Sequence, residues 1–332
     1  MSRGLAIDLG SSQTRVWLEG RGVVFDEPSV IAVNQRTGAV LEVGEAAFDA
    51  VADASGHVVA ERPLRSGVVS DFESTTALLE LVLDKVADIR IGRRPRVLLS
   101  VSSSSTNVER RALEEAVRRA GAGKIHLVDQ PLAAAIGARL PIEDALGSMM
   151  VDVGGGRCEV AVIALGGIVA SRAVRVGGHA IDEAIQRYVR DTHGLAIGDR
   201  TAEEVKFAIG SAAPLGEGVQ AAVRGRELGT GLAHEVVLDA EEVREAIEGP
   251  VSMIVNAVLG TLADCPPELT HDAIEQGMWL TGGGSNLEGL DSRLARESNL
   301  AVHHVADPFS AVIEGIGAML EAFEEYTFAL RA

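Results

Sequence analysis

The most constraining feature of this sequence is a pattern of strands and glycine turns that occurs in two widely separated stretches. Residues 5–24 read as an apolar strand, an Asp-x-Gly turn, a second strand, a glycine turn and a third strand, and residues 149–169 read the same way. Asp8 and Asp152 occupy the same place in the two copies. One Asp-x-Gly is usually a simple hairpin turn, but two in matched contexts predict a chain built from two related half-molecules.

The glycines of these two turns have a physical purpose. A strand that bends sharply beside a ligand needs glycine, because glycine adopts positive φ and lets the backbone approach closely. Backbone N–H groups can then face phosphates, and Asp8 and Asp152 can hold Mg²⁺ directly or through water at the mouth of a cleft between the halves. The turn residues assigned to phosphate binding are Gly10, Ser11, Ser12, Gln13, Gly154, Gly155 and Gly156.

A third glycine-rich turn follows a short apolar strand at residues 278–280. This turn contains Thr281, Gly282, Gly283 and Gly284. We expect a helix to begin at about Leu287, so that its N-terminus offers partial positive charge and a nucleotide base or sugar can lie against the backbone. Taken alone, the segment is equally well explained as a plain turn between a strand and a helix.

Apolar residues between and after the hairpins follow helical spacing, which predicts an α/β alternation. Thr106 and Glu109 form a capping box ahead of one apolar helix face, and Thr201 and Glu204 repeat this pattern ahead of another. Two helices that start at these boxes are therefore expected.

The longest helical pattern follows Ala240 and ends before Pro266, with Pro250 as an expected kink. Its uncharged part, residues 249–263, is shorter than the roughly 20 apolar residues that a membrane span needs. No signal-peptide pattern precedes the first strand, so we expect a soluble, cytoplasmic protein for which peripheral membrane contact stays open.

Length and charge narrow the class of protein further. A chain of 332 residues with 47% hydrophobic content exceeds the size at which single cores usually stop growing, so we expect two lobes. The net charge of −18 argues against nucleic acid as a partner, because phosphate backbones favour clustered Lys and Arg. Cys158 and Cys265 have no second Cys or His at metal-ligand spacing, which gives no support to a disulfide framework or a zinc site.

With three glycine turns in this order, the chain resembles the superfamily of actin, sugar kinases and heat-shock ATPases. Within it, the chain is similar to the MreB family of bacterial actin-like proteins, including its Mbl-type paralogues, over nearly its whole length. Besides the turns at residues 8–14 and 280–284, the stretches that carry the resemblance are residues 27–30, 62–68, 95–97, 108–112, 130–137, 174–178 and 200–203.

The resemblance implies an actin-like ATPase fold, in which duplicated ribonuclease-H-like halves form two lobes and four subdomains around a nucleotide cleft. The first lobe would comprise residues 1–146, with a small subdomain inserted at about residues 32–70. The second lobe would comprise residues 147–332, with a small subdomain inserted at about residues 182–239.

The resemblance also implies that ATP and Mg²⁺ bind between the lobes and that subunits stack head to tail into paired protofilaments that guide cell-wall synthesis beneath the membrane. The partners would be further copies of the chain and membrane proteins of cell-wall synthesis and morphogenesis. Asp8 and Asp152 would hold the metal. Further positions matching the family's site are the catalytic positions Gln130, Asp152 and Arg157 and the nucleotide-binding positions Gly177, Gly178, Glu203 and Lys206. From the residues alone, Glu203 and Lys206 are equally the first turn of a capped helix.

Several departures from the family pattern surround the expected ligand. Gln130 stands where relatives usually carry Glu; an amide orients water but cannot accept its proton, and losing a general base typically lowers the rate on the order of 10²- to 10⁴-fold. Actin carries Gln at this place, so the change alone does not abolish hydrolysis. Arg157 replaces a Thr near the terminal phosphate, where it could act as a cationic clamp or fill the place of the attacking water. Residues 11–13 replace Thr-Ala-Asn, and His179 replaces an acidic residue, so we expect nucleotide binding with weakened hydrolysis.

Membrane contact in relatives often uses an N-terminal amphipathic helix or a hydrophobic loop before a Pro-Arg-Val sequence. Only four residues precede the first strand here, so we expect no such helix. The loop contains Ile89, Arg90, Ile91, Arg93 and Arg94, which could press against anionic lipid at about 1 kcal/mol per basic residue. A solvated basic turn is the alternative interpretation.

Three functions are compatible with these motifs: a filament-forming cytoskeletal ATPase, a nucleotide-binding scaffold with little turnover, and a small-molecule kinase or phosphotransferase of the same superfamily. The third needs a substrate-binding acid or base near the cleft, and no residue stands out as one. P-loop and nucleophile-elbow motifs are absent from the sequence. His126, His303 and His304 fall in expected strands, where packed or surface histidine is the better interpretation.

Overall fold

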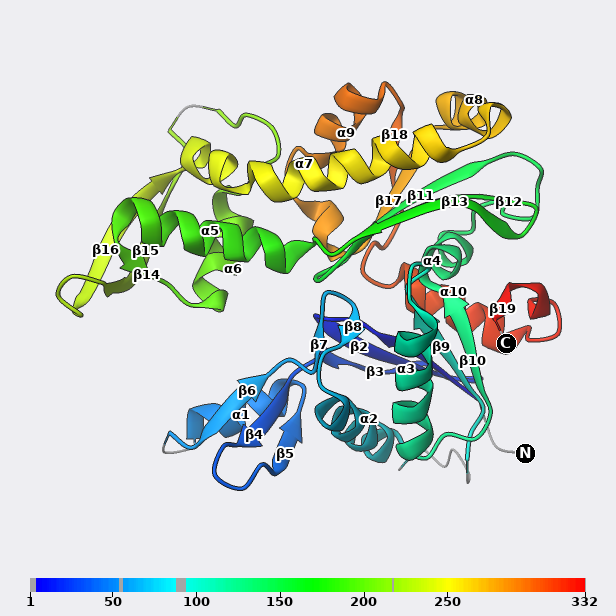
Figure 1. Ribbon diagram of the computed structural model, residues 1–332, viewed down its shortest axis with the longest axis horizontal. Helices are drawn as coiled ribbons and strands as arrows, with labels where there is room; N and C mark the ends of the chain where they lie inside the picture. Colours follow the sequence, from blue (N-terminus) through cyan, green and yellow to red (C-terminus); the bar gives the residue numbers. More distant parts are fainter. Residues whose placement is uncertain (1–3, 54–55, 88–93, 217, 332) are drawn as a thin grey trace.

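The computed structural model describes residues 4–53, 56–87, 94–216 and 218–331, which form two lobes that face each other (Figure 1). Each lobe has a large central sheet and a smaller sheet on the side away from the chain termini. This arrangement confirms the predicted α/β fold with two lobes.

The central sheet of the first lobe contains the first copy of the repeated hairpins. Its strand order is β19-β10-β9-β1-β2-β3. β1, β2 and β3 pair antiparallel, while β9 and β10 add parallel strands beside β1. The strands are β1 (Leu5–Leu9), β2 (Gln13–Leu18), β3 (Gly22–Pro28), β9 (Val97–Val101), β10 (Ile125–Asp129) and β19 (Leu330–Arg331).

The central sheet of the second lobe repeats this plan with the order β13-β12-β11-β17-β18. β11, β12 and β13 pair antiparallel, and β17 and β18 add parallel strands beside β11. Asp8 lies opposite Arg15 in the first hairpin, and Asp152 lies opposite Glu159 in the second, so the predicted equivalence of the two aspartates is confirmed. The strands are β11 (Ser148–Val153), β12 (Cys158–Ala164), β13 (Gly167–Val174), β17 (Met278–Thr281) and β18 (Val302–His304).

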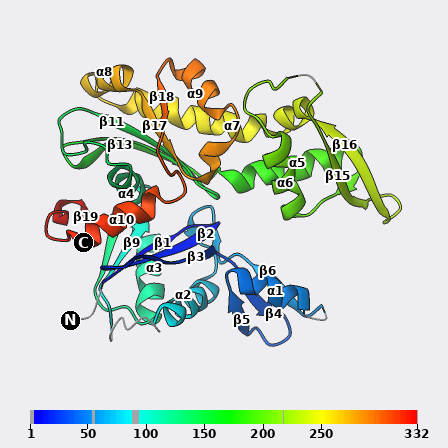
Figure 2. The same cartoon turned by 180° about the vertical axis from the view of Figure 1, so that it is seen from behind.

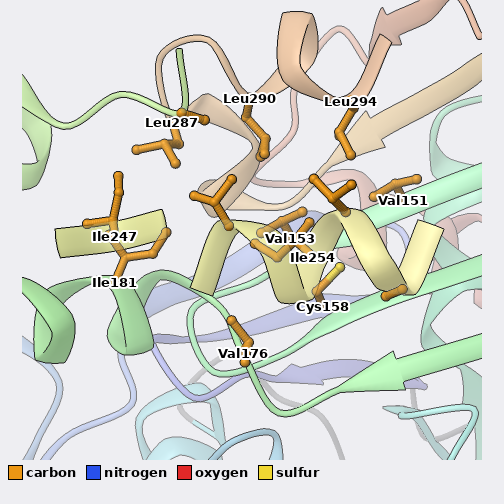
Figure 3. Close-up of a cluster of buried hydrophobic side chains, with 14 of the residues drawn as sticks. Val151, Val153, Cys158, Val176, Ile181, Ile247, Ile254, Leu287, Leu290 and Leu294 are labelled. Atoms are coloured by element: carbon orange, nitrogen blue, oxygen red, sulfur yellow. The ribbon is translucent and has the colours of Figure 1, made fainter. Parts of the chain in front are cut away.

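Helices cover the outer face of each central sheet. In the first lobe, α2 (Phe72–Ala87) and α3 (Asn107–Arg119) pack on a core formed by alternate residues of the strands. In the second lobe, α7 (Ala240–Asp264) lies along β12 and β13. Figure 3 shows Ile254 of α7 beside the strand residue Val153 and Ile247 of α7 beside Ile181, in the same buried cluster as Leu290 and Leu294. Along the chain, α7 is followed by α8 (Pro267–Gln276) and α9 (Leu290–Ser298).

The smaller sheets are both formed by segments inserted between elements of the central sheets. In the first lobe the order is β5-β4-β6, with α1 (Glu45–Asp53) packed on it; in the second it is β14-β15-β16, next to α5 and α6. The hairpin of β7 and β8 connects the first small sheet to α2. The bounds are β4 (Ile31–Asn34), β5 (Val40–Val43), β6 (Val58–Glu61), β7 (Leu64–Arg65), β8 (Val68–Val69), α5 (Gly178–His193), β14 (Leu195–Ala196), α6 (Asp199–Ile209), β15 (Gln220–Glu227) and β16 (Ala233–Asp239).

A core shared by both lobes lies between the two central sheets, where α4 (Gln130–Gly137) packs against α10 (Ala311–Glu321) (Figure 2). It joins Ala6 of the first sheet and Met150 of the second sheet to both helices. The chain thus returns to the first lobe at its C-terminal end, where β19 pairs with β10 and η2 (Thr327–Ala329) precedes it. The boundary between residues 146 and 147 stays a prediction, and this return shows that α10 and β19 are shared with the first lobe's sheet.

Local sequence signals located some helix ends correctly and others not. The capping box of Thr106 and Glu109 is present at the start of α3. The second predicted box is wrong, because α6 already begins at Asp199 and Gly198 is its N-cap, which places Thr201 inside the helix. The helix expected at about Leu287 is present but begins later: a 3₁₀ turn, η1 (Gly283–Asn286), follows the third glycine turn, and α9 begins at Leu290.

The long helix α7 matches its prediction and contains Pro250. By length and composition alone it is the one helix, within the described residues, that could cross a membrane. Residues such as Val243, Ile247 and Ile254 of α7 are buried in the core of the second lobe, which accounts for its apolar character in a folded domain. The proposed lipid-contacting residues Ile89, Arg90, Ile91 and Arg93 lie outside the described residues, and Arg94 is exposed.

Candidate functional site

A cavity of about 500 Å³ opens between the two lobes, where β1 and β11 end. Its volume is within the range of pockets that hold small ligands. The predicted site residues on its wall are Asp8, Gly10, Ser11, Ser12, Gln13, Gln130, Asp152, Gly154, Gly155, Gly156, Arg157, Gly178, Glu203, Lys206, Gly282, Gly283 and Gly284. Gly177 lies behind the second turn instead, where a Cβ would collide with the carbonyl oxygens of Gly154 and Gly155.

The two hairpin turns have the same backbone geometry. The N–H of Gly10 donates to the carbonyl of Gln13 at 2.9 Å, and the N–H of Gly154 donates to the carbonyl of Arg157 at 2.8 Å. A Cβ on Gly155 would collide with the Ser12 hydroxyl, so the two turns approach closely across the cleft. Glycine at this position is therefore required for the turns to meet.

Two buried carboxyl groups face the cavity from equivalent positions. Asp8 is 9% exposed and Asp152 is 2% exposed. The Ser100 hydroxyl donates to Asp8 Oδ1 at 2.8 Å, and Gln130 Nε2 donates to Asp152 Oδ2 at 2.8 Å. Burial raises the pKa of Asp8, and burial, with the nearby charges of Glu159 and Asp8, raises the pKa of Asp152 to about 7. The two aspartates thus interact electrostatically across the cleft.

These two carboxyl groups fit a magnesium ion. Mg²⁺ in proteins commonly takes one or two carboxylates and completes its coordination with phosphate oxygens and water. The described residues contain no cluster of three or more His, Cys, Asp or Glu side chains that could hold a metal on their own. A cation between Asp8 and Asp152 would stabilise the charged form of both carboxyl groups, whose pKa values are raised mainly by burial.

Arg157 projects from the second turn towards the first lobe. Its Nε donates to the carbonyl of Ser66 at 3.1 Å and its Nη1 donates to the Ser104 hydroxyl at 3.3 Å. Glu159 lies 3.8 Å from the same Nη1, and Arg157 is only 8% exposed. The guanidinium group is therefore engaged by protein atoms on two sides.

The third glycine turn lies directly against the end of β11. Gly282 has φ 81°, and a Cβ there would collide with Asp152 Oδ1 and with the Val153 carbonyl. Phe309, which is 55% exposed, lies beside Gly283, where a Cβ would be 3.0 Å from its ring. Glycine is needed here both for the positive φ and for the close approach.

A buried ion pair borders the cavity on the side of α6. Lys206 Nζ lies 2.8 Å from Asp182 Oδ1 and 3.9 Å from Glu203 Oε1. Burial raises the pKa of Asp182 to about 6, although the Lys206 charge opposes this shift. Phe207, next to Lys206, is 75% exposed and also contributes to the cavity wall.

His179, at the start of α5, connects the two lobes. Its Nε2 lies 2.8 Å from the Ser12 hydroxyl. Burial, followed by the positive charges of Arg62 and Lys206, lowers the pKa of His179 to about 4, so the imidazole is neutral at pH 7.

Comparison with known proteins identifies the family of this chain. The model of the MreB/Mbl protein family matches residues 2–327, which is nearly the whole chain. The chain belongs to the MreB/Mbl family.

Its relatives match over nearly their full length. The cell shape-determining protein MreB of Escherichia coli (strain K12) is 44% identical over 328 residues, covering 97% of this chain and 94% of the relative. The cell shape-determining protein Mbl of Bacillus subtilis (strain 168) is 37% identical over 324 residues, covering 98% of this chain and 97% of the relative.

Solved structures of the family confirm the actin-like fold. MreB5 of Spiroplasma citri bound to ADP superposes with a TM-score of 0.90 at 31% identity, covering 98% of both chains. The MamK double helical filament has a TM-score of 0.79 at 22% identity over 96% of this chain and 98% of that chain, and this likeness concerns the fold alone.

Several residues at the site of this MreB/Mbl family member were not predicted from the sequence. Glu159 follows three residues after the Asp-x-Gly-Gly-Gly pattern of the second turn and could have been found from that spacing. Ser100, Asp182 and Phe309 belong to no recognisable motif. Only the packing of separate elements brings Ser100 and Phe309 to the cavity wall and Asp182 to Lys206.

Proposed function

We propose that this chain binds ATP with Mg²⁺ between its lobes and polymerises into cytoskeletal filaments that organise cell shape and cell-wall synthesis. The observation that carries the proposal is that the duplicated hairpins present Asp8 and Asp152 to one cavity. Relatives named as cell shape-determining proteins and structures of Spiroplasma citri MreB5 bound to ADP and AMPPNP support it.

Different residues would bind the metal, the phosphates, and the base and sugar. Asp8 and Asp152 would hold Mg²⁺, which when bound neutralises charge on the phosphates. Backbone N–H groups within residues 11–13 and 155–156 would cradle the phosphates, as glycine turns do in other phosphate sites, while the N–H groups of Gly10 and Gly154 close the two turns. The glycines at 282–284, together with Glu203 and Lys206, border the base and sugar.

ATP hydrolysis is slow at most in this proposal. The amide of Gln130 cannot accept a proton, and it already donates to Asp152. The guanidinium of Arg157 bonds to Ser66 and Ser104 of the first lobe. These contacts favour a second candidate, a nucleotide-binding scaffold of the same fold with little or no turnover. A sugar-kinase-like phosphotransferase is a third candidate, and no residue at the cavity favours it.

The cellular setting follows from the family and the composition. We propose that copies of the chain stack head to tail into paired protofilaments, and that cell-wall synthesis and morphogenesis membrane proteins are further partners. The location is cytoplasmic, with weak membrane contact through residues 89–94. The net charge of −18 argues against nucleic acid as a partner.

Titration calorimetry with MgATP tests the binding site. The wild type should take up MgATP, and Asp152→Asn should weaken binding at least about tenfold, or about 1.4 kcal/mol, because it removes one of two metal-binding charges. Asp191→Asn, on the exposed end of α5, is the matched control and should bind like the wild type. Absence of uptake by the wild type would overturn the proposal.

Phosphate release measured alongside pelleting in MgATP separates the ATPase from the scaffold. The double variant Gln130→Glu, Arg157→Thr restores a carboxylate base and a hydroxyl, so it should release phosphate on the order of 10²-fold faster than the wild type. Wild-type release as fast as that of the double variant would show that hydrolysis is not weakened.

A further inference from the structure

Several side chains at the cleft bond directly from one lobe to the other, and four of them lie around the two hairpin turns. Arg157, Glu159 and His179 belong to the second lobe, and Ser12 belongs to the first. We call these four residues the cross-lobe latch. Their partners are protein atoms in every case, so none of these contacts requires a bound molecule as a bridge.

Arg157 contributes the most extended contact of the latch. It reaches the tip of the β7–β8 hairpin, where Ser66 (φ 51°) and Gly67 (φ 71°) both have positive φ, as a type I′ turn requires. A Cβ on Gly67 would lie 2.9 Å from Arg157 Nε, so the turn is shaped closely around the guanidinium. The second bond of Arg157, to the Ser104 hydroxyl, engages the loop after β9.

Glu159, two residues after Arg157, binds the same loop after β9. Its Oε2 accepts from the Ser103 N–H at 3.0 Å and from the Ser103 hydroxyl at 2.9 Å. The carboxylate is 1% exposed, and Arg157 lies on its other side. Charged hydrogen bonds of this kind are stronger when water is excluded, and breaking one partner leaves a buried charge uncompensated.

Ser12 and His179 form the part of the latch nearest the glycine turns. The Ser12 hydroxyl and His179 Nε2 are 2.8 Å apart. The hydroxyl of the preceding residue, Ser11, accepts a hydrogen bond from the Gly67 N–H at 2.8 Å. An alanine at position 12 would have no hydroxyl to make this bond. A threonine at position 157 would be too short to reach Ser66 and Ser104 together.

We propose that the cross-lobe latch keeps the cleft closed by itself, so that closure in this chain does not depend on a bound nucleotide. A ligand shifts a conformational equilibrium only by its difference in affinity for the two states. Where the closed state is already favoured by contacts within the protein, nucleotide adds little to closure. The latch is a property of the chain alone and does not rest on the proposed ATP binding.

Distance measurement by fluorescence energy transfer tests the latch in the full chain. Labels on Arg36→Cys, in the turn between β4 and β5, and Gly229→Cys, in the turn between β15 and β16, place one dye on each smaller sheet. Arg36 is exposed, and a Cβ at Gly229 would meet nothing within 4 Å. Cys158 and Cys265 are buried, so the engineered thiols should react selectively.

Without nucleotide, the labelled wild type should show the same transfer efficiency as with MgATP. Arg157→Thr should lower the efficiency without nucleotide, and Ser12→Ala, a change that removes a single oxygen, should lower it by a smaller amount. Addition of MgATP should restore both variants towards the wild-type value.

Arg175→Ala is the matched control, because Arg175 also bonds across the lobes, to Glu109 at 3.2 Å, but its side chain is 65% exposed. Exposed ion pairs contribute little to the free energy that favours the closed state, so the cleft of this variant should stay closed. The latch is overturned if the unliganded wild type is as open as Arg157→Thr, or if neither Arg157→Thr nor Ser12→Ala opens. Failure of MgATP to close an opened variant would count against the proposed nucleotide binding and not against the latch.

Discussion

His179 lies at the start of α5 with its ring in the cleft, and its surroundings keep it uncharged. Burial is the main reason that its pKa falls to about 4, and the charges of Arg62 and Lys206 add to the effect. A neutral imidazole can share a hydrogen bond with the Ser12 hydroxyl in either direction, depending on its tautomer.

His179 should make stability depend on pH between about 6.5 and 4. In this range the unfolded chain takes up a proton that the folded chain refuses, so the free energy of unfolding falls as pH falls, by at most about 1.4 kcal/mol per pH unit. Urea unfolding of wild type and His179→Gln across this range should show a flatter profile for the variant. Parallel profiles would contradict the assigned protonation state.

Residue-level prediction from the sequence named residues that the structure brings to one cavity, but it did not predict their contacts. The spacing of Asp8 and Asp152 in two matched patterns was enough to predict that they share a cavity. The departures at Arg157 and His179 were visible as well, but their partners were not. Those partners, on the β7–β8 hairpin and on the first turn, are separated from them by about 90 and more residues, and only lobe packing brings them together.

Among the elements, α4 and α10 make the closest helix contact at the centre of the molecule. A Cβ on Gly137 would collide with the carbonyl of Ala311, and a Cβ on Gly315 would collide with the carbonyl of Ala133. The two helix backbones are therefore in direct contact, and both positions require glycine.

Gly315→Ala should lower the free energy of unfolding by about 1–3 kcal/mol, because the added methyl group forces the helices apart. The control is Gly260→Ala in α7, where the methyl group meets only the end of the half-exposed Arg172 side chain. There, the about 1 kcal/mol that alanine gains over glycine in a helix offsets a lost surface ion pair. Chemical denaturation of both variants is the measurement, and equal effects would refute the backbone contact.

Element starts were predictable where a local signal decides them. Thr106 caps α3 because its hydroxyl and the Glu109 carboxylate satisfy free N–H groups within four residues. The same pattern at Thr201 failed because Gly198 already starts the helix one turn earlier, with Asp199 in its first turn. Several starts can satisfy a short pattern, and the packing of α6 beside α5 is not visible in local sequence.

At the scale of the whole molecule, the core between the sheets makes the two lobes one folding unit. Residues from both central sheets pack with α4 and α10 in one core. The two tryptophans report on opposite sides of this core: Trp17 of β2 packs on Gly317 of α10, and Trp279 of β17 stacks near His303. Each lobe therefore carries its own fluorescent probe.

Trp17→Phe and Trp279→Phe leave one probe each, and both variants should unfold in a single cooperative step. In each variant, the urea transition followed by tryptophan fluorescence should coincide with the transition followed by far-ultraviolet circular dichroism, because the shared core cannot be lost from one lobe alone. Separate midpoints for the two signals would show that the lobes unfold independently.

The glycine contact between α4 and α10 also determines how the molecule can move. Backbones that touch inside a common core cannot slide or separate without opening that core, so the freedom that remains is a pivoting of one lobe about this line. The smaller sheets lie far from this axis (Figure 1), so they move the most when one lobe pivots. A small rotation at the contact of Gly137 and Gly315 thus produces a large displacement of the smaller sheets.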